Sequence, residues 1–149
     1  MDIIELAPDF KEFLSLLNSR DVEYLLVGGY AVGYYGYPRS TNDLDIWVGI
    51  SPTNAAKLVS VFQAFGFSQD SVEPAAFLDE KRVIRMGVPP VCIDVIMTVT
   101  GLVFSACYAR RIIEDIDGVT VNILSLEDLK TNKLASGRHK DLNDIERLP

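Results

Sequence analysis

The sequence has few of the residues that build disulfide, zinc or histidine-based sites. It holds two cysteines, Cys92 and Cys107, and one histidine, His139. Because the cysteines lie in apolar surroundings far apart in the chain, they predict buried free thiols in a reducing compartment, and neither a disulfide framework nor a zinc site. His139 lies in a charged segment, where we expect a solvated surface position. Histidine chemistry is therefore not expected at the centre of this protein.

Long hydrophobic runs and an excess of positive charge are also missing. No apolar run approaches the roughly 20 residues needed to cross a bilayer, and the acidic start MDIIEL is unlike a signal peptide. We therefore expect a cytoplasmic protein with no membrane partner. The formal net charge of -7 is spread over segments of mixed sign, which gives no general attraction to polyanions. An extended nucleic-acid surface is not expected, although a local basic site is compatible with this composition.

The chain has 149 residues, of which 48% are hydrophobic, so it is long enough for one real core and too short for two ordinary domains. We expect a single domain over residues 1–149. Hydrophobic spacing and turn residues predict helices over 2–19, 29–36, 52–65 and 126–136, strands over 23–29, 42–50 and 118–125, a hairpin divided by 87–90, and a last helical turn or two from residue 140. Residues 102–113 fit either a strand or a helix. This mixture predicts an α/β or α+β fold with a mixed sheet.

Two acids lie inside the second predicted strand, in the segment NDLDIWVGI. Positions i and i+2 of a strand point to one face, so Asp43, Asp45 and Trp47 should share a side, opposite Leu44 and Ile46. Like charges held this close raise one pKa unless a cation lies between them. Carboxylates together with substrate phosphates are the usual environment of Mg²⁺. The alternative is a strand whose outer face is simply solvated.

A third acid, Asp94, lies in the hydrophobic strand PVCIDVIMTV. An unpaired carboxylate there would cost several kcal/mol, so it needs a partner or a metal. If this strand lies beside the strand of Asp43, three carboxylates converge, as two-metal phosphoryl transfer requires. The alternative is a buried acid paired with an arginine such as Arg39 or Arg85.

Two glycines, Gly28 and Gly29, end the first predicted strand and open a helix. Without side chains, their backbone N–H groups and the positive end of the helix dipole are open to an anion such as a triphosphate. A plain turn is the alternative. The pair matches neither the G-x-x-x-x-G-K-[ST] loop nor the G-x-G-x-x-G dinucleotide motif.

Together these motifs resemble the signature of the nucleotidyltransferase superfamily that includes DNA polymerase beta. Gly28-Gly29 precedes Asp43-Leu44-Asp45 by thirteen residues, and a single Asp94 follows in a later strand. The run YPRSTNDLDI is similar to the Arg-x-Thr-x-Asp-hydrophobic-Asp run of stand-alone bacterial and archaeal nucleotidyltransferases, which include the AbiE-type toxins and the minimal nucleotidyltransferases. The closing segment SLEDLKTNKLASGRHKDLNDIERL is similar to their closing pattern through Lys133, Arg138, Lys140, Asp141 and Asp144.

The resemblance implies a nucleotidyltransferase fold with a short mixed β-sheet flanked by helices. It also implies Mg²⁺-dependent transfer of a nucleoside monophosphate from an NTP such as ATP, with Mn²⁺ as the alternative metal. It gives the chain's residues the following roles: Asp43, Asp45 and Asp94 as metal ligands and catalytic residues, and Gly28, Gly29, Arg39, Thr41 and Lys133 as nucleotide-binding residues. The acceptor would be a protein or an RNA, and an antitoxin protein would be the partner of a toxin.

Two other functions compete with this hypothesis. A catalytically silent scaffold that binds a nucleotide or a partner protein would keep the fold, but loss of activity usually removes the carboxylates. A manganese glycosyltransferase would use Asp-x-Asp with a nucleotide sugar, but such enzymes generally need a larger nucleotide-binding domain. The closing Lys, Arg and Asp residues also have a structural alternative, a salt-bridge network that holds the last helix to the body.

Overall fold

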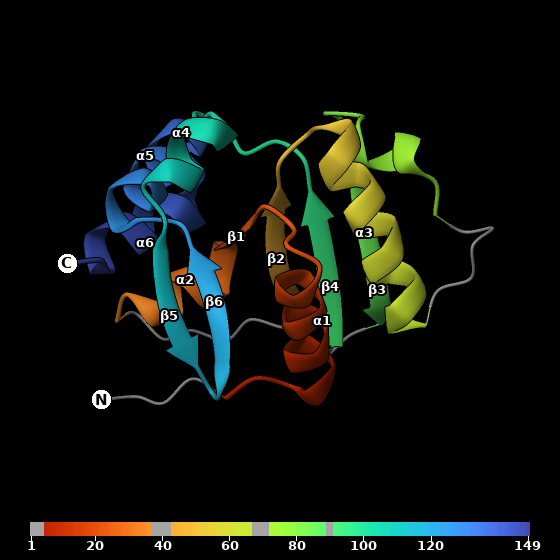
Figure 1. Ribbon diagram of the computed structural model, residues 1–149. Coiled ribbons are helices and arrows are strands. Elements are labelled where there is room, and N and C mark those ends of the chain that lie inside the picture. The colour runs from red at the N-terminus through yellow and green to blue at the C-terminus, as the bar shows by residue number, and fades with distance from the viewer. Residues whose placement is uncertain (1–4, 37–42, 67–71, 89–90) are drawn as a thin grey trace.

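The fold is a six-stranded mixed sheet with helices packed around it (Figure 1). The computed structural model describes residues 5–36, 43–66, 72–88 and 91–149. The helices are α1 (Pro8–Ser19), α2 (Gly28–Tyr34), α3 (Pro52–Phe65), the 3₁₀ helix η2 (Pro74–Phe77), α4 (Phe104–Ala109), α5 (Leu126–Ser136) and α6 (His139–Arg147). The strands are β1 (Tyr24–Val27), β2 (Asp43–Val48), β3 (Val83–Val88), β4 (Val91–Ile96), β5 (Ile112–Ile116) and β6 (Val119–Ile123). The predicted α/β class with a mixed sheet is confirmed.

The sheet has the strand order β3-β4-β2-β1-β6-β5. The β2–β4 and β1–β6 pairs are parallel, whereas β1–β2, β3–β4 and β5–β6 are antiparallel. The hairpin expected around residues 87–90 is therefore the β3–β4 pair. The centre of the sheet is formed by β1, β2 and β4, so the segments that carry Gly28, Asp45 and Asp94 lie side by side.

Most of the predicted elements are present, with shifted ends. The first helix begins at Pro8, and not at residue 2, because proline fits the first helical position, where its missing N–H costs nothing. The ambiguous 102–113 segment is a short helix, α4, followed by the start of β5. The last helical segment is longer than expected, since α6 has nine residues. Within the described part of the chain, none of these helices is long and apolar enough to cross a membrane.

The hydrophobic core lies on both faces of the sheet. In Figure 1, α1 and α3 lie over the strands β2 and β4, while α4, α5 and α6 gather at the other end of the sheet. The rings of Phe13 and Phe62 join α1 to α3 at 5.9 Å between centroids. On the face that carries the acids, Trp47 is buried against Phe104 of α4, with centroids 5.1 Å apart, and donates a hydrogen bond to the Met97 carbonyl. The acidic face of β2 is therefore solvated only in part.

One buried amide links three segments next to the start of α3. The Oδ1 of Asn54 accepts a hydrogen bond from the Glu23 N–H at 2.8 Å, and its Nδ2 donates to the carbonyls of Glu23 and Gly49 at 3.1 and 2.8 Å. Asn54 is 3% exposed, so its amide is shielded from water while it holds these backbone groups. This side chain fixes the entry into β1 relative to the exit from β2.

We predict that Asn54→Ala lowers the free energy of unfolding by about 2 kcal/mol, because buried backbone groups lose their partners. Urea denaturation followed by circular dichroism measures this change. Gln63→Ala, at an exposed position of the same helix, is the matched control and should change stability by less than about 0.5 kcal/mol. Equal stability of the two variants would contradict the structural role of Asn54.

Candidate active site

A row of polar side chains crosses three neighbouring strands at the centre of the site. Asp45 of β2 is the register partner of Asp94 of β4, and Asp94 is the partner of Arg85 of β3. Side chains of directly paired residues point to the same face of a sheet. Asp94 therefore lies on the same face as Asp45, with Asp43 two positions away on β2. The structure thus brings together the three acids that the sequence singled out.

Asp94 is held by Arg85. The guanidinium donates from Nε to Oδ1 of Asp94 at 2.8 Å and from Nη2 to Oδ2 at 2.9 Å, and Nη2 also lies 3.4 Å from Oδ2 of Asp43. These contacts raise the pKa of Arg85 further above its usual value, chiefly through hydrogen bonding and charge from Asp94. Asp94 is 7% exposed, so this partner meets the need of a buried carboxylate. The arginine pairing considered from the sequence is present, and Arg85 is the partner.

Asp45 is partly buried, and the hydrogen bonds of the Arg85 guanidinium go to Asp94 and Asp43 and not to Asp45. Burial raises the pKa of Asp45 to about 6, and repulsion from Asp94 and Asp43 adds to the rise, while Lys140 and Lys133 act in the opposite direction. Its carboxylate lies against Gly28, where a Cβ atom would come within 2.1 Å of Oδ2. Gly28 also has a φ of +69°, a conformation that L side chains rarely adopt. Glycine at this position thus makes room for the acid.

The donor atoms at this site have the chemistry that Mg²⁺ requires. Asp43, Asp45 and Asp94 supply hard oxygen ligands, and a divalent cation would relieve the burial and the repulsion between carboxylates that raise the pKa of Asp45. As the side chains stand, the described residues contain no group of three or more His, Cys, Asp or Glu that could hold a metal ion. Both oxygens of Asp94 accept hydrogen bonds from Arg85 instead. The three acids are chemically suitable ligands for Mg²⁺, and the Arg85 guanidinium occupies part of their capacity to coordinate it.

A cleft of about 510 Å³ opens beside Asp45. It lies between the end of β1, the segment after β4 and the helices α5 and α6, and is lined by Val27, Gly28, Asp45, Ile96, Thr98, Val99, Thr100, Asn132, Lys133, Ala135, Ser136 and Arg138. A larger hollow of about 620 Å³ lies near the end of α1, but Asp21 is the only charged residue in its described lining. The first cleft is therefore the better candidate for a charged substrate.

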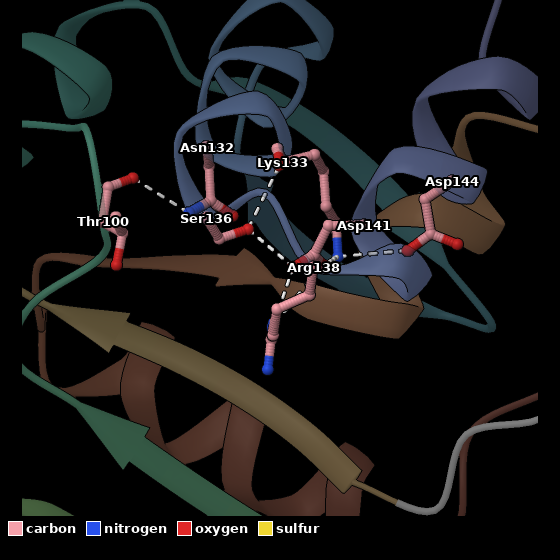
Figure 2. Close-up of polar contacts among 7 residues, drawn as sticks. All are labelled: Thr100, Asn132, Lys133, Ser136, Arg138, Asp141 and Asp144. Atoms are coloured by element: carbon pink, nitrogen blue, oxygen red, sulfur yellow. Dashed lines mark hydrogen bonds and ion pairs between the residues drawn. The ribbon is translucent and has the colours of Figure 1, made fainter.

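The far wall of the cleft is a buried ion-pair network (Figure 2). The Nζ of Lys133 lies 3.1 Å from Asp141 and 3.2 Å from Asp144, and all three residues are at most 4% exposed. Ser136 and Arg138 also donate to Oδ2 of Asp141, at 2.6 and 2.7 Å. This network joins α5 to α6 across Gly137, whose φ of +64° lets the chain reverse between the two helices. The structural alternative for the closing motif is therefore present in the fold.

The electrostatics of this network favour its charged form. Burial alone would raise the pKa of Asp141, but hydrogen bonds from Arg138, Ser136 and Lys133 hold it well below its usual range. Arg138 is different from Lys133, because its side chain is 71% exposed and lines the cleft. The Nε and Nη2 of Arg138 contact Asp141, at 2.7 and 3.4 Å. Lys133 is thus largely paired with the carboxylates of Asp141 and Asp144, whereas the side chain of Arg138 is accessible from the cleft.

The other residues that the sequence predicted for the site are Gly29, Arg39 and Thr41. Gly29 is buried in the first turn of α2, next to Gly28. Arg39 and Thr41 lie outside the described residues. Sequence reasoning did not assign a site role to Arg85 or Arg138, although alternation on β3 could have placed Arg85 on the face of Asp94 once the hairpin register was known.

The chain has a nucleotidyltransferase fold, and the arrangement of its acids agrees with that class. The chain belongs to the family described as "Nucleotidyltransferase of unknown function (DUF6036)", which it matches over residues 4–148. This agrees with the superfamily resemblance seen in the sequence. The comparisons do not show the more specific resemblance to AbiE-type toxins. No curated protein matches the chain in sequence.

A solved structure has the same fold. It is a "putative nucleotidyltransferase" of Thermotoga maritima, which superposes with a TM-score of 0.61 at 15% sequence identity. The match covers 93% of this chain and 88% of the other. At this identity the likeness speaks for the fold alone, so the activity must be argued from the site.

We predict that Asp45→Asn makes the metal-free protein more stable at neutral pH. The folded-state pKa of about 6 is above the ordinary value of 3.8, so the folded chain holds a proton that the unfolded chain releases, and stability is lost as pH rises from about 4 through 6. Asp45→Asn carries no ionisable group at this position, so it does not lose this stability as pH rises. Urea denaturation in EDTA should show no advantage for Asp45→Asn near pH 3.5 and an advantage of about 1–3 kcal/mol at pH 7. A difference independent of pH would contradict the assigned environment.

We also predict that Lys133→Met destabilises the fold strongly. It leaves the carboxylates of Asp141 and Asp144 buried without their shared cation, a change that typically costs about 3–5 kcal/mol. Thermal and urea unfolding measure the loss. Lys140→Met removes the same charge from an exposed position of α6 and should have little effect on stability. Similar stability for both variants would show that Lys133 is not required to hold α6.

Proposed function

We propose that the protein is a Mg²⁺-dependent nucleotidyltransferase that transfers a nucleoside monophosphate from an NTP to an acceptor hydroxyl. The observation that carries this proposal is the pairing of Asp45 with Asp94 in the register of parallel strands, beside Gly28 and a cleft that basic residues line. Asp43, Asp45 and Asp94 would hold Mg²⁺, or Mn²⁺ in its place. When bound, the metal supplies charge stabilisation for the attacking and leaving oxygens.

Residues of the chain would perform the other roles in the reaction. In the reaction, the acceptor oxygen forms a bond to the α-phosphorus, the bond from that phosphorus to the bridging oxygen breaks, and pyrophosphate leaves. Asp94, beside Asp45 in the row of acids, would accept the proton of the acceptor hydroxyl. Gly28 and Gly29 would leave their backbone open to the triphosphate, as the absence of side chains permits.

The basic wall of the cleft would receive the phosphates. Fixed cations stabilise the charge of a transferring phosphoryl group and of the leaving pyrophosphate. We assign the direct contact to Arg138, because it is exposed to the cleft, and a positioning role to Lys133, because its ammonium is buried between Asp141 and Asp144. Arg39 and Thr41 remain candidate nucleotide contacts from the sequence motif alone.

The biological setting remains a proposal that rests on the sequence resemblance. A protein side chain or an RNA end would be the acceptor, and a cytoplasmic toxin with a partner antitoxin is the system that the resemblance suggests. The donor would be ATP or another NTP. Incubation with each radiolabelled NTP, Mg²⁺ and a cell extract would reveal both the nucleotide and the class of acceptor.

One observation favours the second candidate, a silent nucleotide-binding scaffold. Arg85 occupies both oxygens of Asp94 and could do so permanently as a substitute for metal. Such a protein would bind NTP without transferring any label, which separates the two functions in the same experiment. The presence of all three acids on one face of the sheet argues for the enzyme, since loss of activity usually removes the carboxylates.

We predict that Asp94→Asn reduces transfer at least about 100-fold, because it removes a metal-binding charge and the proton acceptor while keeping the side-chain shape. The measurement is incorporation of label from α-³²P-NTP. Circular dichroism should show that the variant is folded. Glu12→Gln, which neutralises an exposed acid on α1, is the control and should retain full activity. Undiminished transfer by Asp94→Asn would remove Asp94 from the mechanism.

A further inference from the structure

Arg85 lies where the proposed metal site needs positive charge. Its guanidinium contacts two of the three acids, with a two-point contact to Asp94 and a longer one to Asp43. A fork of this kind is the strongest common pairing of a carboxylate with a side-chain cation. It uses the same oxygen atoms that a divalent ion would use, so the guanidinium and the ion compete for the lone pairs of Asp94 and repel each other there.

The position of Arg85 allows its side chain to move away from the acids. The residue lies on β3, which is the edge strand of the sheet, and its side chain is 54% exposed. Withdrawal into solvent therefore breaks no core packing. Asp94, in contrast, is anchored on the inner strand β4, and its side chain is only 10% exposed. The carboxylate stays and the guanidinium is the part that can move.

The third acid shows that Arg85 does not complete the site. Among the described residues, the hydrogen bonds of the guanidinium go to Asp94 and Asp43 and not to Asp45. The arginine thus sets one positive charge against two of the three carboxylates. A divalent cation that all three acids share would neutralise more of this charge than the arginine does.

We propose that Arg85 is a built-in competitor of the metal: it stabilises the metal-free site by occupying Asp94 and Asp43, and it withdraws when a divalent cation binds. This inference rests on the proposed function, because it takes the three acids to be the metal site. It assigns Arg85 a regulatory role, in which the residue sets how much free metal is needed before the site fills.

The opposite role is physically distinct. An arginine that keeps its contact in the metal-bound state would orient Asp94 toward the ion, and its removal would then weaken metal binding. A competitor has the reverse effect, since its removal frees the ligand and takes away a repelling positive charge. The sign of the change in metal affinity therefore decides between the two roles.

The test measures Mn²⁺ binding by electron paramagnetic resonance, without nucleotide, in the wild type, Arg85→Met and Arg82→Met. Arg82 is an exposed arginine beside the start of β3, and the ion pairs of Asp43 and Asp94 are made with Arg85 instead, so the Arg82 variant controls for the loss of one charge. We expect Arg85→Met to bind Mn²⁺ about tenfold more tightly than the wild type, and Arg82→Met to differ by less than about twofold. We also expect Arg85→Met to unfold at lower urea concentration in EDTA.

A second measurement follows the arginine itself in the wild type. The Nε–H resonance of Arg85, assigned by its loss in Arg85→Lys, should move when Mg²⁺ is added, because its hydrogen bond to Asp94 is broken. This measurement decides the matter if Arg85→Met does not fold. An unchanged resonance at saturating Mg²⁺ would overturn the proposal.

The outcomes separate this inference from the proposed function. If the wild type binds Mn²⁺ and Arg85→Met binds equally or more weakly, the competitor role is overturned while the metal site stands. If neither the wild type nor Arg85→Met binds Mn²⁺, the metal site itself fails, and the inference fails with it.

Discussion

Repulsion among three carboxylates on one face of a sheet is the constraint on which this site depends. The register of β2 and β4 places Asp45 and Asp94 in the same row, and Asp43 follows on the same side. Such an arrangement costs stability unless positive charge is nearby. The surrounding chain supplies that charge from two directions, from Arg85 on the edge strand and from the basic residues of α5 and α6.

These two sources of charge differ in how firmly they are held. Lys133 is buried between Asp141 and Asp144, so it is part of the fold and joins α5 to α6. Arg85 and Arg138 each bind one buried carboxylate while most of the side chain stays exposed. Burial thus separates the cation that maintains the structure from the cations that can respond to a substrate or a metal. This distinction could not be read from residue types, since all three are basic residues near acids.

The sequence predicted the elements of the fold well because local signals mark them. Ser51 with Pro52 predicts the start of α3, and in the structure the Ser51 side chain accepts a hydrogen bond from the Asn54 N–H. Ser125 plays the same part for α5, where its hydroxyl accepts a hydrogen bond from the Asp128 N–H. The sequence also indicated that Asp94 needs a partner, because a single charge in an apolar strand is costly. The pairing with Arg85, however, depends on the register of the β3–β4 hairpin, and periodicity alone does not determine register.

The same limit applies to the surroundings of Trp47. Alternation correctly placed Trp47 on the side of Asp43 and Asp45, but it gave no sign that α4 would cover that side, since the 102–113 segment was ambiguous. Burial of Trp47 closes the acidic face toward one end of β2 and leaves the cleft open toward Gly28 and α5. Within the described part of the chain, the cleft beside Asp45 is lined by the basic residues Lys133 and Arg138. The tertiary packing of one short helix therefore covers one part of the acidic face, while the cleft lies at another.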